Sequence, residues 1–566
     1  MRMSLRRLLS IAFASFATTL LVSLLSTLNA EQHRDPTWTD KAHRKLNLKS
    51  NLGQPDHEIS HDNIGDSRHK QPRQPPHPLS DQFQNIESNR IPRVDKSERL
   101  KKLKQISTKS DGEKKKKLWQ IETEKRWRKD DQVLVPIEPV DGELPKRTSY
   151  DADIVDLRDK WHVDVFPEPD EACPNKTTLE QFYWKKYKKM WHKDDSWDLF
   201  FSQIGNCDLY REKSEIVENL LEDMATMPIK SVSNLDGGTQ VKLSLTFENG
   251  KQAVFKPMRF GRYYETDPNH FYFTDFERHN AEIAAFHLDR LLGFRRAIPT
   301  VGRVLNITQI RGISDGVIKY FYSPAKNLCF VGKCDYYCDT THAICGEPDL
   351  KEGSVQVWLP GDEIAQRDYW RSPFKRTYSK RDQLAPWQID STFCTWKVKN
   401  TPPFTTGRRL LDIVDLYIFD FIAGNQDRHH YESFTFFDPV PHLSYIVHLD
   451  NGRGFGSPHF DDIDILAPLT QCCIIRPSTV KTLLKLYLSP SSLAQQLKDS
   501  LRHDPAYPVL ARKYLIAVDR RLEIVLKEVA KCIQQTGDLK KVLINHFYNP
   551  NAPPDAKEFE DSDSNE

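Results

Sequence analysis

One apolar segment constrains the fold more than any other part of this sequence. Residues 410–423 carry mostly large apolar side chains, and Gly424, which can adopt the left-handed backbone that ends helices, follows them. This pattern predicts a buried helix that ends at Gly424. The next residues, 424–432, read Gly-Asn-Gln-Asp-Arg-His-His-Tyr-Glu. The helix therefore delivers a strongly polar loop to a fixed place in the protein.

A second polar motif follows about twenty residues later. Alternating apolar residues over 445–449 predict a short strand that leads into Asp450, within the sequence Leu-Asp-Asn-Gly. Asp-x-Gly is the form of a metal-binding loop in kinases. Zinc binding by His429 and His430 is the weaker alternative, because adjacent side chains diverge and no third ligand has the expected spacing.

The region before these motifs has the layout of a kinase small lobe. Residues 241–255 alternate around a Glu-Asn-Gly turn, which predicts a β-hairpin that ends at Lys256. A helix from about Glu277 to Leu292 follows, because alanine and leucine recur along one stripe. Phosphoryl transfer needs carboxylates for a metal, a cation for phosphates and a base near the acceptor hydroxyl. Further helices are predicted at 178–191, 214–225 and 515–529.

At these residues the sequence resembles the Golgi casein kinase family, the secretory-pathway serine/threonine kinases of the family with sequence similarity twenty. The resemblance runs from about Leu235 to Cys532. It implies an α+β fold of the two-lobed, atypical protein-kinase-like type, with a mainly helical large lobe and stabilising disulfides. The motifs that carry it are Gly-Gly-Thr-Gln at 237–240, Phe-Lys-Pro-Met at 255–258, Phe-Glu-Arg-His-Asn-Ala-Glu at 276–282, Phe-His-Leu-Asp-Arg at 286–290, residues 424–432, and His-Leu-Asp-Asn-Gly-Arg-Gly-Phe-Gly at 448–456.

The resemblance also implies roles for individual residues. Asp427 is expected to be catalytic, and Glu277 and Asp450 are expected to bind the metal. ATP and Mn²⁺ are the implied cofactors, with Mg²⁺ as a second metal that the site could use. The backbone of residues 356–359 is expected to meet the adenine. The full set of expected nucleotide contacts is Gln240, Lys256, Glu277, Gln356, Val357, Trp358, Leu359, Glu432 and Asp450.

The first 30 residues have the layout of a secretory signal peptide, with a basic start, an apolar run and a small terminal residue. The apolar run is also nearly long enough to be a type II membrane anchor. The next region is polar, basic and rich in proline, so it cannot bury enough apolar surface to fold. The expected divisions are a signal segment at 1–30, a disordered stem at 31–149, an N-terminal segment with the small lobe at 150–355, the large lobe at 356–550 and an acidic tail at 551–566.

The 10 cysteines, in a chain that begins like a secreted protein, favour disulfides over metal ligands. Their pairing does not follow from the sequence alone. The resemblance implies the pairs Cys329 with Cys345, Cys334 with Cys338, Cys394 with Cys472, and Cys473 with Cys532. Cys173 and Cys207 remain as a fifth pair, and Asn175 and Asn306 occupy glycosylation sequons.

We therefore expect a protein kinase of the Golgi lumen and the extracellular space, which transfers the γ-phosphate of ATP to serine in Ser-x-Glu motifs of secreted proteins. Two alternatives stay open. One family member phosphorylates xylose in glycosaminoglycan linkers, and residues 466–469 and 472–476 look closer to it. Another is a pseudokinase that lacks the metal-binding glutamate, present here as Glu277.

The expected partners follow from the same family resemblance. Secreted protein substrates come first, and a homodimer or a heterodimer with a related kinase or pseudokinase is left open. The formal charge of +2 gives no reason to expect nucleic-acid binding. Membrane attachment is expected only through an N-terminal anchor.

Overall fold

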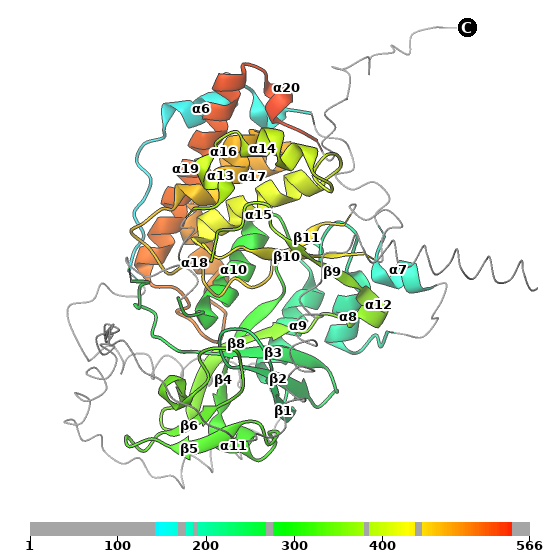
Figure 1. Ribbon diagram of the computed structural model, residues 1–566, viewed down its shortest axis with the longest axis vertical. Helices are drawn as coiled ribbons and strands as arrows, with labels where there is room; N and C mark the ends of the chain where they lie inside the picture. Colours follow the sequence, from blue (N-terminus) through cyan, green and yellow to red (C-terminus); the bar gives the residue numbers. More distant parts are fainter. Residues whose placement is uncertain are drawn as a thin grey trace, which may run out of the picture. The chain divides into compact units, whose positions relative to one another are not determined.

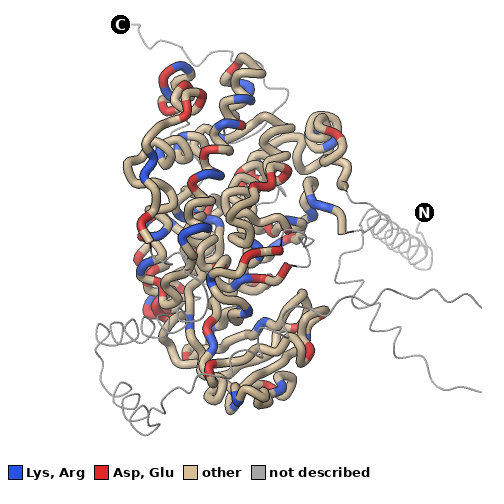
Figure 2. Tube along the Cα trace, turned by 90° about the vertical axis from the view of Figure 1, so that its left-hand side faces the viewer, with Lys and Arg blue, Asp and Glu red and all other residues tan. Residues whose placement is uncertain are grey.

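The computed structural model describes residues 142–167, 177–184, 191–267, 275–378, 384–435 and 444–545. The expected signal segment, most of the stem and the acidic tail lie outside the described residues, as do Cys173 and Asn175. Among the described residues, no helix combines the length and apolar character that crossing a bilayer requires. Basic and acidic residues are interspersed along the described chain (Figure 2), in agreement with its nearly balanced charge.

A five-stranded antiparallel sheet forms the small lobe, in the order β1-β2-β3-β8-β4 (Figure 1). The expected hairpin is confirmed, because β2 pairs with β3 and Gly250 takes a φ of 78° in the turn between them. Lys256 lies near the end of β3, opposite Ser354 of β8. The strands are β1 Ile229–Leu235, β2 Lys242–Phe247, β3 Gln252–Pro257, β4 Thr300–Asn306 and β8 Leu350–Val357.

Helix α10, His279–Leu291, connects the two hydrophobic cores of the molecule. Phe286 belongs to the core under the sheet, whereas Ala284 and Leu288 belong to the core of the helical lobe. The helix contacts β4 and β8 on one side and α18, Leu493–Leu501, on the other. It begins later than the sequence predicts, so Glu277 precedes the helix instead of lying in its first turn.

Buried helix α15, Arg409–Ala423, is the centre of the large lobe, and Gly424 ends it with a φ of 72°, as the sequence predicts. Helices α16 and α19 pack against it, and a three-stranded sheet β11-β10-β9 lies beside it (Figure 1). Helix α19 contains the expected helix 515–529. The bounds are α16 Ala467–Cys472, α17 Pro477–Leu488, α19 Arg512–Thr536, β9 Arg367–Arg371, β10 His430–Phe434 and β11 Ile446–Val447.

Two other helix predictions have mixed outcomes. Helix α9 confirms the helix at 214–225, but the hydroxyl of Ser214 donates to Gln203 instead of capping the helix. Only the first part of the expected helix 178–191 is described, as α7. The remaining elements are α6 Ala152–Asp159, α7 Leu179–Trp184, α8 Ser196–Gln203, α9 Glu215–Thr226, α11 Ile307–Arg311, α12 Asp362–Ala365, α13 Pro386–Ile389, α14 Phe393–Trp396, α20 Leu539–Val542, β5 Lys319–Tyr322, β6 Leu328–Val331 and β7 Ile344–Cys345.

The beginning of the N-terminal segment, residues 142–166, packs on the large lobe, whereas its helices α8 and α9 pack in the core under the sheet. Helix α6 contacts α19, and Leu144 packs against the helical core. The guanidinium of Arg147 lies 3.8 Å from the ring centre of Tyr487. Ordered contacts therefore begin before residue 150, inside the region that composition assigns to the stem.

Disulfides and a capping asparagine fix several connections. Cys207 is disulfide-bonded, and Cys173, the partner that the sequence suggests, lies outside the described residues. Asn306, an expected glycosylation site, caps α11, and its Oδ1 accepts from the Gln309 N–H at 3.0 Å. The four disulfides formed between described residues are Cys329–Cys345, Cys334–Cys338, Cys394–Cys472 and Cys473–Cys532, the pairs that the resemblance implies.

A buried polar joint connects the sheet to the helical lobe. Arg262 donates to Glu352 of β8 and to two carbonyl oxygens of residues 506–508, at 2.8 and 2.7 Å. The Asp504 carboxylate accepts from the Gly302 N–H on β4 at 3.1 Å. A Cβ atom at Gly302 would lie 2.5 Å from the Asp504 carboxylate, so glycine is required at this close approach.

The joint predicts a pH-dependent stability. Burial raises the pKa of Asp504 to about 7. Because the folded protein then holds this proton more tightly than the unfolded chain, the free energy of unfolding falls as the pH rises from 5 to 8. We expect the free energy of unfolding of Asp504→Asn, measured relative to that of the wild type, to rise by about 2 kcal/mol between pH 5 and pH 8. Thermal unfolding at a series of pH values measures the gain, and an equal effect at both ends contradicts the prediction.

Candidate functional site

Three carboxylates surround the ammonium group of Lys256. Its Nζ lies 2.6 Å from Glu282 Oε1, 3.0 Å from Glu277 Oε2 and 3.0 Å from Asp450 Oδ1. The structure thus brings together Lys256, Glu277 and Asp450. Glu282, on α10, is the residue that sequence reasoning missed. Its signal was an acidic side chain in the first turn of that otherwise largely apolar helix.

The acids differ in how deeply they are buried. The Glu282 side chain is 1% exposed, and its second oxygen accepts from the Asn451 N–H at 3.2 Å. Burial raises the pKa of Glu282, and the charge of Lys256 offsets part of that shift. The Asp450 side chain is 57% exposed, and Lys256 holds its pKa well below the ordinary value. Burial disfavours the charge of Lys256, but the carboxylates raise its pKa well above the ordinary value.

These acids fit a divalent cation. Oxygen atoms of Glu277, Glu282 and Asp450 lie within 4.8 Å of one another, and one ammonium group cannot neutralise three carboxylates. Carboxylate oxygens are ligands that Mg²⁺ and Mn²⁺ prefer. Both oxygens of buried Glu282 are bonded, one to Lys256 and one to a backbone N–H, so the more exposed Glu277 and Asp450 are the two acids suited to hold the metal.

Close backbone packing holds Glu277 beside Asp450. Asp450 adopts a φ of 59°, in the left-handed region that aspartate tolerates better than most residues. The Gly452 carbonyl accepts from the Arg278 N–H at 2.6 Å. A Cβ atom at Gly452 would lie 2.9 Å from the Glu277 Cβ, so a larger residue would push the two proposed metal ligands apart.

Asp427 lies in the loop between α15 and β10. The Tyr378 hydroxyl donates to its Oδ1 at 2.6 Å, and Arg453 forms an ion pair with its Oδ2. The side chain of Asp427 is 8% exposed. Nδ1 of His429 lies 2.7 Å from the backbone carbonyl oxygen of Asp427. Sequence reasoning gave no role to Tyr378 or Arg453, although Arg453 belongs to a quoted motif.

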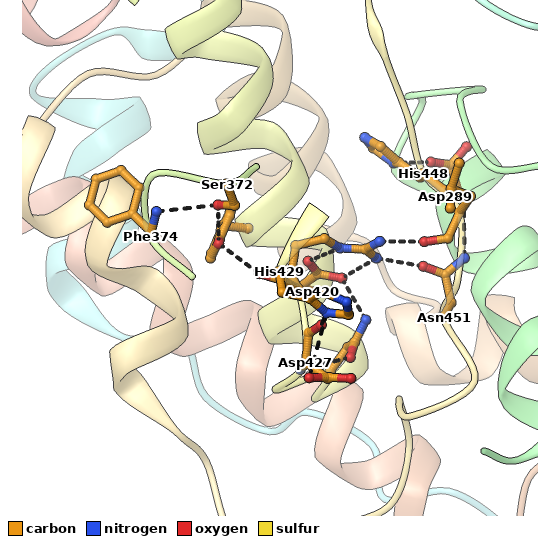
Figure 3. Close-up of polar contacts among 12 residues, drawn as sticks. Asp289, Ser372, Phe374, Asp420, Asp427, His429, His448 and Asn451 are labelled. Atoms are coloured by element: carbon orange, nitrogen blue, oxygen red, sulfur yellow. Dashed lines mark hydrogen bonds and ion pairs between the residues drawn. The ribbon is translucent and has the colours of Figure 1, made fainter. Parts of the chain in front are cut away.

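Arg428, the residue after Asp427, joins the two polar loops. Because two of its partners flank Asp450 in the chain, Arg428 fixes the loops that carry Asp427 and Asp450 relative to each other. Figure 3 shows this network between α15 and the Asn451 loop. The guanidinium donates to Asp420 Oδ2 at 2.7 Å, to Asp420 Oδ1 at 2.8 Å, to Asn451 Oδ1 at 2.7 Å and to the Leu449 carbonyl.

A second buried contact anchors the start of the Asp450 loop. Nδ1 of His448 lies 2.7 Å from Oδ2 of Asp289, and both side chains are fully buried (Figure 3). Asp289 belongs to α10, the helix that carries Glu282. The position of Asp450 is therefore tied both to α10 and, through Arg428, to α15.

The glycine turn 237–240 offers groups suited to a phosphate. Gly237 and Gly238 have φ values of 80° and 75°, and Asp335 accepts from the Gly238 N–H at 3.1 Å. Gln240 is 4% exposed, and its amide nitrogen has no hydrogen-bond partner among the described residues. A buried donor of this kind is costly unless a ligand accepts its hydrogen bond. This observation fits the expected nucleotide contact.

The segment expected to meet adenine is partly engaged already. Gln356 donates through Nε2 to the Thr300 hydroxyl at 3.1 Å. The backbone N–H groups of Val357 and Trp358 donate to carbonyl oxygens before β4 and at the start of β3, at 3.1 and 3.2 Å. Leu359 is 5% exposed. The N–H groups of Val357 and Trp358 are therefore already paired, and the expected contact of this segment with adenine stays a prediction.

Glu432 lies on β10, and its carboxylate accepts from Nε of Arg367 at 2.9 Å. Burial, with the charges of Asp450 and Glu432, raises the pKa of Tyr369 to about 12. Tyr369 is paired with Glu432 in the sheet register. The carboxylates of Glu432 and Asp450 thus both raise the pKa of Tyr369. Glu432 is paired with Arg367, whereas Asp450 is paired with Lys256.

This chain is similar in sequence to a protein kinase, a pseudokinase and a sugar kinase. "Extracellular serine/threonine protein kinase CeFam20" of Caenorhabditis elegans is 55% identical over 381 residues, which cover 67% of this chain and 74% of the relative. The human "Pseudokinase FAM20A" is 41% identical, with 60% of this chain and 66% of the relative covered. The human "Glycosaminoglycan xylosylkinase" is 42% identical, with 60% of this chain and 81% of the relative covered.

A solved structure and a family model give the same result. The crystal structure of the Golgi casein kinase with Mn/ADP bound is 50% identical, covers 75% of this chain and 98% of that chain, and has a TM-score of 0.68. This likeness confirms the two-lobed, kinase-like α+β fold that the sequence predicts. The family model described as "Golgi casein kinase, C-terminal, Fam20" matches residues 195–541. The chain therefore belongs to the Fam20 family of the Golgi casein kinase.

Proposed function

We propose that this chain is an ATP-dependent serine/threonine protein kinase of the Golgi lumen and the extracellular space. The observation that carries the proposal is the cluster of Lys256, Glu277, Glu282 and Asp450, with Arg428 tying its loop to Asp427. Relatives named as extracellular kinases and a Golgi casein kinase structure with Mn/ADP bound support the same activity and cofactors.

In the proposed mechanism each residue has a separate task. Glu277 and Asp450 hold the divalent cation, and Glu282 orients Lys256 toward the nucleotide phosphates. The metal, when bound, supplies neutralisation of phosphate charge. Asp427 accepts the proton of the acceptor hydroxyl. Positioning and charge stabilisation supply most of the rate in such transfers.

The proposed acceptors are secreted proteins with serine in Ser-x-Glu motifs. Two cations near the Asp427 loop support an acidic acceptor. Arg371 is paired with His430 in the register of β9 and β10, and Lys375 follows shortly after β9. Burial, His429 and these two cations lower the pKa of His430 to about 4. A dimer with a related kinase or pseudokinase is the second proposed partner.

Two other functions remain as alternatives. Relatives named as glycosaminoglycan xylosylkinases support a sugar acceptor. Relatives named as pseudokinases support a partner without catalytic turnover. The contact of Glu277 with Lys256 speaks against the pseudokinase, because the acid that the pseudokinase is expected to lack is present and in place.

A parallel acceptor assay tests the proposed function. With Mn²⁺ and labelled ATP, the secreted protein is expected to phosphorylate a Ser-x-Glu peptide and not a xylose-containing linker oligosaccharide. Asp427→Asn is expected to lower kcat by about 10²–10⁴-fold, the usual contribution of a general base. Asp499→Asn, at an exposed position of α18, is the matched control.

Each other result of this assay has a clear meaning. Transfer to the oligosaccharide alone assigns the chain to the sugar kinases. Nucleotide binding without transfer to either acceptor assigns it to the pseudokinases. Full activity of Asp427→Asn removes that residue from the catalytic step.

Substitution of Glu277 is expected to weaken Mn²⁺ binding, whereas substitution of Glu282 is expected to lower stability. Glu277→Gln removes a proposed metal ligand at a partly exposed position, so the Mn²⁺ affinity is expected to fall at least about tenfold. Glu282→Gln removes the closest partner of buried Lys256, so it is expected to lower the free energy of unfolding by about 1–3 kcal/mol. Calorimetric Mn²⁺ titration and thermal unfolding separate the effects. Equal loss of Mn²⁺ affinity in both variants would contradict the assignment of Glu277 to the metal and Glu282 to Lys256.

A further inference from the structure

The cations around the site differ in what holds them. Lys256 contacts three carboxylates, and Arg428 is bound to Asp420 and to the Asn451 loop. Lys242 lies beneath the glycine turn, where a Cβ atom at Gly238 would be 2.9 Å from its Nζ. Arg453 is different, because its ion-pair partner is the carboxylate proposed as the catalytic base.

Arg453 reaches three parts of the site. Its Nη1 is paired with Asp427, and its Nε donates to the Asp275 carbonyl at 3.2 Å, two residues before Glu277. Its Nη2 lies 3.5 Å from the Thr239 hydroxyl in the glycine turn. The side chain is 11% exposed. The guanidinium therefore lies between the proposed base, a segment next to a proposed metal ligand, and the turn proposed to cover phosphates.

Both carboxylate oxygens of Asp427 are engaged by other side chains. The two oxygens of Asp427 already have donors, Tyr378 on Oδ1 and Arg453 on Oδ2. A neighbouring cation favours the ionised form of a carboxylate and so makes it a weaker base. A nucleotide phosphate carries more negative charge than one carboxylate, and arginine binds phosphate oxygens with good geometry. Bound ATP can therefore compete with Asp427 for Arg453.

We propose that Arg453 leaves Asp427 for the γ-phosphate of bound ATP and stabilises the charge that develops during transfer. This inference rests on the proposed kinase function. In the step, the serine oxygen forms a bond to the γ-phosphorus, and the bond from that phosphorus to the β–γ bridging oxygen breaks. The electron pair of the broken bond leaves with ADP, and the serine proton passes to Asp427. Departure of Arg453 leaves Oδ2 of Asp427 open to accept this proton.

Nucleotide binding tests the proposal without an acceptor. We compare the affinity for ADP with Mn²⁺ and the affinity after aluminium fluoride is added, which mimics a phosphoryl group in transfer. In Arg453→Gln, the affinity for ADP is expected to change less than about threefold. The tightening caused by aluminium fluoride is expected to fall at least about tenfold, since a donor to the transferring group is lost.

Turnover gives a second readout. Arginines that contact the transferring phosphoryl group are worth about 10³–10⁵ in kcat, so Arg453→Gln is expected to lose about 10³-fold on a serine acceptor. Arg453→Lys keeps the charge without the forked geometry, and is expected to recover part of the loss. Arg290→Gln, which loses an ion pair with Glu218 and a cation–π contact with the Phe286 ring, is the matched control.

The outcomes separate this proposal from a merely structural role. If Arg453 only holds Asp427 in place, kcat falls but aluminium fluoride tightens ADP binding as in the wild type, and the proposal is overturned. Unchanged kcat in Arg453→Gln also overturns it. If the wild type shows no transfer, the kinase function fails, while the binding measurements still decide the role of Arg453. Should Arg453→Gln not fold, the same binding comparison on Arg453→Lys decides the question.

Discussion

The site depends first on one buried guanidinium. Arg428 is 6% exposed and Asp420 is fully buried, and their pairing connects the end of α15 to the chain on both sides of Asp450. Burial opposes the charge of Arg428, but Asp420 raises its pKa above the ordinary value. A buried ion pair of this type adds little net stability, because desolvation offsets the attraction. Its consequence is geometric: other arrangements of the two loops would leave a buried charge without partners.

Much of this fold follows from local patterns in the sequence. The apolar run at 410–423 can only be satisfied by a buried helix, and the alternation at 241–255 specifies a hairpin that places Lys256 on the sheet. The resemblance then implied the roles of individual residues and the disulfide pairs. What local patterns cannot supply is the contact of distant segments. Tyr378 meets Asp427 across 49 residues, and periodicity contains no information about such a pair.

The missed glutamate illustrates the same limit. Glu277 and Glu282 both lie near the start of a helix in the sequence, and either could be the partner of Lys256. Burial distinguishes them, since Glu282 is enclosed with the ammonium group while Glu277 and Asp450 keep exposed surface. The distinction arises because α10 begins at His279 and directs Glu282 inward. A helix boundary is a property that sequence reasoning places only within a few residues.

The joint formed by Arg262 and Asp504 also limits how the molecule can open. Strand β4, strand β8 and the 504–508 turn share buried hydrogen bonds, and the contact at Gly302 leaves no space between them. Rotation of one lobe away from the other would break these bonds in a place that water does not reach. The sheet and the 504–508 turn therefore move together, because any displacement that separates them costs buried hydrogen bonds that solvent does not replace.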